Sequence, residues 1–229
     1  MPLPLPLPTV EARAKPPLHC KLSTAPIPLA GWAFLFEERA MQIWAGLGHP
    51  GTQYALHRHN VGFMAADVIA DVHNFGPWQK KFRSLISEGR IGGTRVLLLK
   101  PQTYMNDSGD AVQQALRFYQ LEVDALTAIH DELDLLPMKV KVKTGGGTAG
   151  HNGLRSIDAS LGPDFRRVRI GIGHPGDKAR VTRYVLGNYH KSEFEVLSDL
   201  LGAIAAEADW LAAGDDARFM SDVALRCQQ

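Results

Sequence analysis

The sequence predicts an α/β domain in which one mixed β-sheet is flanked by helices. From Met41 onward, short segments rich in β-branched and aliphatic residues alternate with segments whose apolar residues recur at helical spacing. No linker-like stretch interrupts this alternation, so we expect residues 41–229 to form a single domain. The expected strands are Gln42–Leu47, Thr94–Leu99, Leu126–His130, Met138–Lys143 and Arg167–Ile172. Polar and apolar residues alternate in the fourth, which places it at an edge and favours a mixed sheet.

Three segments have the pattern of helices. The expected helices cover Val61–Ile69, Val112–Tyr119 and Phe194–Leu211. Ser192, with Glu195 three positions later, predicts a capping box at the start of the last one.

Residues 1–40 differ in composition from the rest of the chain. Their prolines are Pro2, Pro4, Pro6, Pro8, Pro16, Pro17, Pro26 and Pro28. Proline removes an amide donor and disfavours helix in the residue before it, so we expect an extended, mobile segment. A signal peptide is the alternative, but no basic region precedes the first leucines and the prolines interrupt the helical region it needs. We therefore expect the fold to begin near Met41 and the preceding segment to be dispensable.

Bulk composition excludes several classes of protein. The formal net charge is +1 at pH 7, so any nucleic-acid surface must be a local patch. The two cysteines, Cys20 and Cys227, lie near opposite ends, which excludes a disulfide framework and a CxxC metal site and suits a reducing compartment such as the cytoplasm. The longest apolar run, Leu29–Phe36, is far shorter than the roughly twenty residues of a membrane span.

A glycine-rich hexad, GLGHPG, follows the first expected strand at residues 46–51. It fits the dinucleotide fingerprint GxGxxG, with Asp71 about twenty residues further on. However, Asp71 falls within a helical pattern, and polar residues follow Gly51 where the fingerprint needs an apolar helix. The hexad also recurs as GIGHPG at residues 171–176, and a repeated strand-to-turn device explains both copies more simply than two nucleotide sites.

A second glycine-rich segment, GGGTAGHNG, covers residues 145–153. Its glycine spacing resembles a Walker A loop, but His151 and Asn152 stand where that loop needs a lysine and a hydroxyl, so we do not expect NTP hydrolysis. Its backbone amides could approach an anion or a polar substrate, although a flexible connector has the same glycine content.

Lys139, Lys141 and Lys143 alternate along one expected strand and therefore share one face. This pattern is typical of a solvated sheet edge that is protected against aggregation. Because the glycine loop follows and another expected strand carries arginines, a phosphate-binding patch is an equal alternative.

Histidines and carboxylates form a further candidate set: His57, His59, His130, His151, Asp131, Glu132 and Asp134. Asp131 leaves a strand end and could orient a histidine, as a carboxylate does in a catalytic triad, but spacing does not say which histidine. Metal ligation is the alternative. Against it, HExxH is absent.

The usual nucleophiles are missing from the sequence. No serine stands in a GxSxG elbow, and neither cysteine has site-like neighbours. A hydrolase built from these residues would therefore use a base that activates water, which suits an ester substrate.

These segments together resemble the bacterial peptidyl-tRNA hydrolase family from Met41 to about Tyr189. The blocks that carry the resemblance are GLGHPGTQY…RHNVGF, KPQTYMNDSG, HDELDL, KVKTGGGTAGHNGLRSI and FRRVRIGIGHPG. The resemblance implies a single-domain α/β enzyme, without metal or other cofactor, that hydrolyses the ester between the peptide and the 3′ ribose of tRNA. It also implies a cytoplasmic monomer that binds the acceptor end of peptidyl-tRNA, with no membrane and no obligate protein partner.

The resemblance also implies roles for particular residues. His59 of RHN matches the catalytic base, and Asp131 of HDE matches the carboxylate that supports it. Asn152 of GHNG and Asn106 of YMN match amides that position the peptide, the ribose or the water. Asn152 is therefore our candidate donor to the oxyanion.

Further positions complete the expected site. The remaining substrate-binding residues are Tyr54, Tyr104, Met105 and His151. The residues expected to clamp a tRNA phosphate are Lys141, Lys143 and Arg169.

His49 departs from the family pattern. The first turn of the family normally reads GLGNPG, and the asparagine helps to distinguish N-blocked peptidyl groups from free aminoacyl groups. A neutral histidine cannot offer both a donor and an acceptor through one amide plane. We therefore expect catalysis to survive and this discrimination to change.

Two other functions would explain part of the sequence. A noncatalytic RNA-binding module would explain the lysines but not the matched histidine, carboxylate and asparagines. A dinucleotide-dependent oxidoreductase would explain the first hexad alone. Release of free tRNA from peptidyl-tRNA tests the first alternative, and titration with NAD tests the second.

Overall fold

The computed structural model describes residues 41–228 of the chain. The extension expected over residues 1–40 lies outside the described residues. The described strands are β1 (Gln42–Gly46), β2 (Gln79–Lys81), β3 (Ser84–Ile91), β4 (Thr94–Pro101), β5 (Leu126–Glu132), β6 (Val140–Thr144) and β7 (Arg166–Gly171). The helices are α1 (Val61–Val72), α2 (Ser108–Tyr119), α3 (Asn152–Leu161), α4 (Val181–Val185), α5 (Phe194–Ala206), α6 (Ala208–Ala213) and α7 (Asp216–Arg226).

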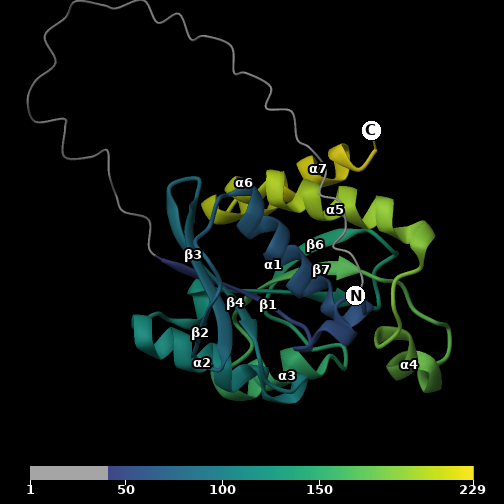
Figure 1. Ribbon diagram of the computed structural model, residues 1–229, viewed down its shortest axis with the longest axis horizontal. Helices are drawn as coiled ribbons and strands as arrows, with labels where there is room; N and C mark the ends of the chain where they lie inside the picture. Colours follow the sequence, from purple (N-terminus) through teal and green to yellow (C-terminus); the bar gives the residue numbers. More distant parts are fainter. Residues whose placement is uncertain (1–40, 229) are drawn as a thin grey trace, which may run out of the picture. The chain divides into compact units, whose positions relative to one another are not determined.

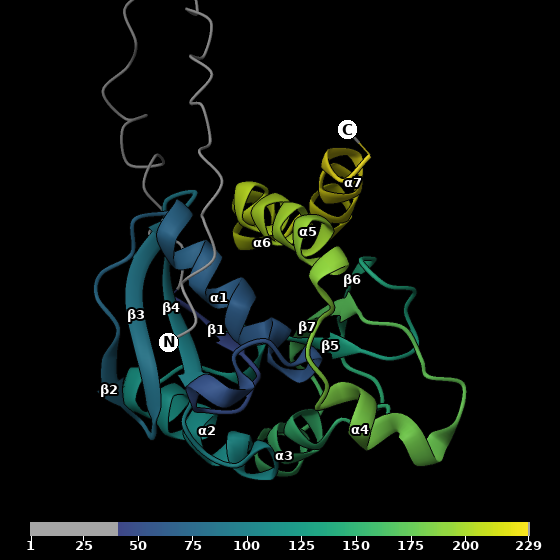
Figure 2. The same ribbon diagram turned by 45° about the vertical axis from the view of Figure 1, so that its right-hand side comes forward.

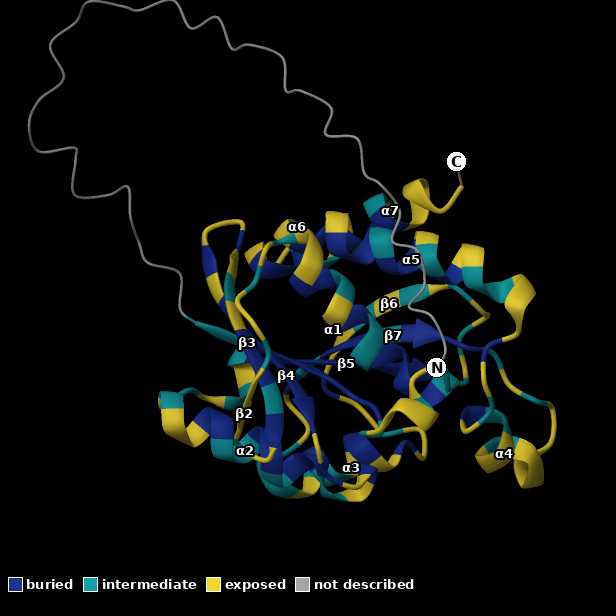
Figure 3. Ribbon diagram, in the orientation of Figure 1, coloured by how far each residue is buried: buried dark blue, intermediate teal, exposed yellow. Residues whose placement is uncertain are grey.

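The strands form one mixed sheet in the order β2-β3-β4-β1-β5-β7-β6. β1, β4, β5 and β7 pair in parallel, whereas β2, β3 and β6 are joined to their neighbours in antiparallel fashion. The predicted mixed α/β architecture is therefore confirmed, and so is the edge position of β6. In Figure 3 the central strands are dark blue along most of their length, whereas β6 carries intermediate and exposed residues.

Helices cover both faces of the sheet (Figure 1). Consecutive strand residues point to opposite faces, so Trp44 and Leu98 enter one core while Ile43 and Leu97 enter the other. α1, α5, α6 and α7 close the first core, and α2 and α3 close the second. Figure 2 shows α4 away from α5, α6 and α7. None of the helices in the described part of the chain is long and apolar enough to cross a membrane.

α1 approaches the sheet unusually closely because two glycines meet there. A Cβ added to Gly62 would lie 2.2 Å from the carbonyl oxygen of Ile129, and one added to Gly46 would lie 2.3 Å from the carbonyl oxygen of Gly62. Real Cβ atoms do not come this close to backbone, so both positions require glycine. The contact brings the residues just before α1 against the end of β5.

The prediction of the last helix was wrong in its extent and in its capping residue. The segment Phe194–Leu211 is two helices, because the chain turns at Glu207, whose buried carboxylate forms an ion pair with Arg226 of α7. The capping residue is His190, not Ser192: the His190 ring accepts from the Ser192 amide, and the Glu193 side chain accepts from the His190 amide. A 3-10 turn at Lys191–Glu193 thus precedes α5.

Several elements were not predicted. β3 mixes polar and apolar residues, yet it forms a hairpin with β4 through Gly92 and Gly93, both of which have positive φ. This glycine pair between two extended segments was the available signal. β2, α3, α4 and α7 were also missed; in α3, Leu154 and Ile157 are buried at helical spacing.

Candidate functional site

A cleft of about 700 Å³ opens at the carboxyl end of β5. The predicted site residues that line it are His49, His59, Met105, Asp131, His151 and Asn152. They come from the loop after β1, the turn before α1, the turn before α2, the end of β5 and the start of α3. The end of a parallel strand is where α/β sheets commonly build their sites.

The segment that carries His59 is held rigidly before α1. Arg58–Asn60 forms a 3-10 turn, and the Asn60 side chain bridges the backbone of the preceding loop. The His49 amide donates to Asn60 Oδ1 and Asn60 Nδ2 donates to the His49 carbonyl, each at 2.9 Å. The first glycine hexad is therefore fastened directly to the turn that presents His59.

Asp131 lies between two imidazoles. Its Oδ1 is 2.8 Å from His59 Nδ1 and 3.2 Å from His151 Nε2. The three residues are buried, at 4 %, 8 % and 9 % exposure for Asp131, His59 and His151. Burial alone would raise the pKa of Asp131, but the charges and hydrogen bonds of His59 and His151 outweigh it and hold this pKa well below its usual range. Asp131 is therefore a carboxylate, which can only accept hydrogen bonds.

His151 has a fixed tautomer because it also caps a helix. Its Nδ1 accepts from the Gly153 and Leu154 amides at the start of α3, at 3.1 and 3.3 Å. Nδ1 therefore carries no proton, so Nε2 carries it and donates to Asp131. The same carboxylate requires a proton on His59 Nδ1, so in the neutral imidazole the free lone pair lies on Nε2.

His49 lies against this network without joining it. Its ring centroid is 5.4 Å from that of His59 and 5.6 Å from that of Tyr54. Burial lowers the pKa of His49, and the neighbouring His59 lowers it further, so the ring is neutral at pH 7. Its Nδ1 is buried and has no hydrogen-bond partner among the described residues, which leaves Nε2 as the ring nitrogen that a substrate could meet.

Three predicted substrate residues are absent from the described lining of the cleft: Tyr54, Tyr104 and Asn106. Tyr104 is 78 % exposed, although the next residue, Met105, is buried in the cleft. Asn106 is exposed and donates to Asp107 at 3.2 Å. Asn152 does line the cleft, and its Oδ1 lies 3.4 Å from Arg155 Nη1.

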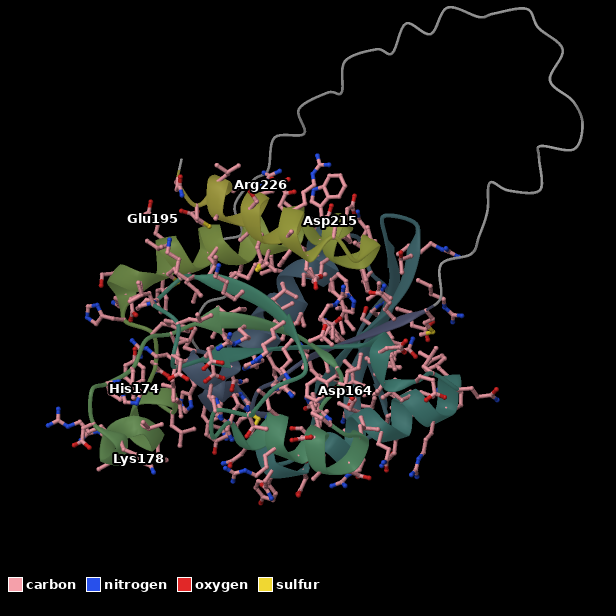
Figure 4. All side chains as sticks on the ribbon, turned by 180° about the vertical axis from the view of Figure 1, so that it is seen from behind. Asp164, His174, Lys178, Glu195, Asp215 and Arg226 are labelled. Carbon is pink, nitrogen blue, oxygen red and sulfur yellow. The ribbon has the colours of Figure 1, made fainter. Side chains whose placement is uncertain are left out.

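The wall formed by α4 and its flanking residues was not anticipated. Val181, Val185 and Leu186 line the cleft from this side, together with His174 and Lys178. Figure 4 labels His174 and Lys178 on the arm that carries α4. The second hexad is a turn, as expected, because His174 Nδ1 accepts from the Gly176 amide at 3.0 Å. Only the folded chain brings this arm to the cleft, so spacing gave no signal for it.

The basic residues lie on β6 and β7. Lys141 is directly opposite Arg169 across the antiparallel pair, and Lys143 is opposite Arg167. Lys143, Arg167 and Arg169 line a second cavity of about 40 Å³. The buried carboxylate of Glu132 accepts from Arg169 Nε at 2.9 Å, so this arginine is held in place but partly neutralised.

His59, Asp131 and His151 could in principle hold a metal, because one ligand atom of each lies within 4.8 Å of the others. The helix cap argues against this use. A metal on His151 Nε2 would force the proton onto Nδ1, which already accepts two amides of α3. The hydrogen bonds of this network fix the tautomers of His59 and His151, and this role fits the geometry better than metal ligation does.

Comparisons with known proteins agree over almost all of the described chain. A family model described as peptidyl-tRNA hydrolase matches residues 43–229. The chain is 68 % identical to a peptidyl-tRNA hydrolase of Rhizorhabdus wittichii over 186 residues, covering 81 % of this chain and 98 % of that one. It is also 68 % identical to one of Sphingopyxis alaskensis over 188 residues, covering 82 % and 100 %. A crystal structure of peptidyl-tRNA hydrolase from Acinetobacter baumannii matches with a TM-score of 0.74 at 40 % identity, covering 80 % of this chain and 94 % of that one.

Proposed function

The chain belongs to the peptidyl-tRNA hydrolase family, and we propose that it cleaves the peptidyl ester with water activated by His59, without a metal ion. The observation that carries this proposal is the Asp131–His59 contact of 2.8 Å beside the cleft. In the neutral ring this contact leaves His59 Nε2 as the base, and no donor among the described residues is hydrogen-bonded to it. The proposed substrate is peptidyl-tRNA bound by its acceptor end.

In the proposed reaction, His59 Nε2 removes a proton from a water molecule as that water attacks the ester carbonyl. Asp131 stabilises the imidazolium that forms, and the proton then passes to the departing 3′ oxygen of the ribose. General-base assistance of this kind contributes about 10²–10⁴-fold. An ester needs no stronger nucleophile, because its alkoxide leaves far more readily than an amine.

Asn152 is the proposed donor to the oxyanion. It opens α3 at the rim of the cleft, and the contact of its Oδ1 with Arg155 leaves Nδ2 available to the substrate. A donor in this role typically contributes about 3 kcal/mol to stabilisation of the transition state. Met105, packed against the same start of α3, shapes the cleft beside it.

Replacement of the proposed base tests this function. We expect His59→Ala to lower the turnover of peptidyl-tRNA by at least about a hundredfold, with tRNA binding nearly intact. His57→Ala is the matched control, because this histidine lies two residues away and outside the described lining of the cleft. A chelator should change neither rate. Native turnover by His59→Ala would contradict the proposal.

A further inference from the structure

The α4 wall of the cleft, formed by Val181, Val185 and Leu186, is joined to the segment that carries His59 by a short two-stranded ribbon. The Arg58 amide donates to the Gly187 carbonyl and the Tyr189 amide donates to the Leu56 carbonyl, each at 3.0 Å. An isolated β-bridge pairs His57 with Asn188 between them. Residues 56–58 therefore run beside residues 187–189, immediately after the residues of α4 that face the cleft.

The Arg58 side chain reinforces this ribbon at four points. Its Nη1 donates to the Asn188 carbonyl at 2.6 Å, and its Nη2 donates to Glu193 Oε2 at 2.7 Å. The guanidinium carbon also lies 4.8 Å from the ring centroid of Tyr184 and 5.1 Å from that of Tyr189. Only 13 % of the side chain is exposed. Arg58 thus ties α4, the loop after it and the turn before α5 to the residue next to His59.

We propose that Arg58 is a positioning residue that fixes the α4 wall of the cleft against the segment that carries His59. This inference rests on the proposed function in one respect, because it takes the cleft as the substrate site. Arginine is required because its planar fork reaches two acceptors while it stacks on aromatic rings. A lysine offers one point charge and cannot make both contacts.

The consequence for the enzyme is a wall that is ordered before the substrate arrives. If the wall were loose, part of the binding free energy would be used to order it, and the loss would appear in binding. Such a loss raises KM and leaves kcat nearly unchanged, because ground state and transition state lose it equally. A residue that instead aligned His59 itself would change kcat.

The test compares Arg58→Gln and Arg58→Lys with Arg117→Gln, which removes an equal charge from the exposed part of α2. We expect KM for peptidyl-tRNA to rise about tenfold in Arg58→Gln, the size of one lost charged hydrogen bond, with kcat within about twofold. Arg58→Lys should recover part of the loss, and Arg117→Gln should match the native enzyme. Amide hydrogen exchange should quicken in residues 181–189 of Arg58→Gln and in the paired residues 56–58, and stay native outside this ribbon.

Other outcomes would overturn the inference. If Arg58→Gln leaves both KM and amide exchange unchanged, the α4 wall is ordered without Arg58. If the variant lowers kcat alone, Arg58 acts by aligning His59 and not by ordering the wall. If Arg58→Gln does not fold, Glu193→Gln removes one partner of the same contact and should give a smaller rise in KM with the same local exchange. The exchange measurement needs no activity, so it separates failure of this inference from failure of the proposed role of His59.

Discussion

His151 connects the start of α3 to the Asp131–His59 pair through its two ring nitrogens. Because its Nδ1 accepts from the amides of α3, His151 carries its proton on Nε2 and donates it to Asp131. The same carboxylate accepts from His59 Nδ1, so the lone pair of the neutral His59 ring lies on Nε2. Sequence resemblance supplied the pairing of His59 with Asp131, which the structure places 2.8 Å apart. It did not supply the role of His151, which we expected to bind substrate. Spacing could not reveal a contact that depends on where α3 begins.

A pH-dependent stability should arise from His130. Burial, followed by the nearby His151, lowers the pKa of His130 from 6.5 to about 3, so between these values the unfolded chain binds more protons than the fold does. The contribution of neutral His130 to the free energy of unfolding is therefore complete above pH 6.5, and about a few kcal/mol of it is lost as the pH decreases toward 3. His130→Asn should make urea unfolding less dependent on pH between 6.5 and 4. An unaltered pH dependence would show that His130 does not cause it.

His49 should control discrimination more than rate. With a neutral ring whose Nδ1 is buried, it offers a substrate a single hydrogen bond through Nε2, where an asparagine would offer a donor and an acceptor. We expect His49→Asn to leave turnover of N-blocked aminoacyl-tRNA within about threefold and to lower cleavage of free aminoacyl-tRNA by about tenfold, the effect of one hydrogen bond. If the ratio of the rates on N-blocked and free aminoacyl-tRNA is the same in the native enzyme and in His49→Asn, His49 has no role in discrimination.

At the scale of elements, the contact between β1 and α1 brings the proposed base to its carboxylate. Because Gly46 and Gly62 carry no Cβ, the helix lies against the ends of β1 and β5. Periodicity predicted the buried strands and α1 well, because a strong apolar pattern fits only one type of secondary structure. It failed at β3 and α3, where polar residues on the solvent side weaken the pattern. The junction of α5 and α6 could not be seen in sequence, because both helices cover the same face and continue one apolar pattern.

Gly62→Ala tests this contact. We expect a loss of about 2 kcal/mol or more in the free energy of unfolding, because the new Cβ would overlap backbone atoms of Ile129 and Leu47. Turnover should also fall, since α1 would move the His59 turn away from Asp131. Gly202→Ala in α5 is the control, because no atom lies within 4 Å of its added Cβ. It should be neutral or stabilising by about 0.5 kcal/mol. Equal effects of the two substitutions in urea unfolding would refute the close-approach argument.

At the scale of the whole molecule, a nearly neutral chain carries two exposed lysines on the edge strand β6. Lys141 and Lys143 are exposed on β6, and β6 pairs with β7, the neighbour of β5. This placement favours the phosphate-patch interpretation over simple protection of an edge. We expect Arg169 to contribute less to phosphate binding than the sequence suggested, because its guanidinium forms an ion pair with Glu132. Sequence alone could not show that opposing charge, since the two residues belong to different strands.

The salt dependence of substrate binding tests this patch. If each lysine neutralises one phosphate, the logarithm of affinity should fall against the logarithm of salt concentration by about 0.7 to 0.9 per contact. The double variant Lys141→Gln/Lys143→Gln should reduce the measured slope by about 1.4 to 1.8. Its kcat at saturating substrate should stay native. A KM that does not respond to salt in either enzyme would remove the phosphate contacts from the account.

The most direct test of the central claim is a double-mutant cycle on the single-turnover rate of peptidyl-tRNA cleavage. If Asp131 acts through His59, Asp131→Asn should slow the native enzyme by about tenfold or more. In an enzyme that already carries His59→Ala, the same substitution should have almost no further effect, because groups that act as a unit are not additive. Two losses that multiply in the double variant would show that the carboxylate and the imidazole act independently, which contradicts the account.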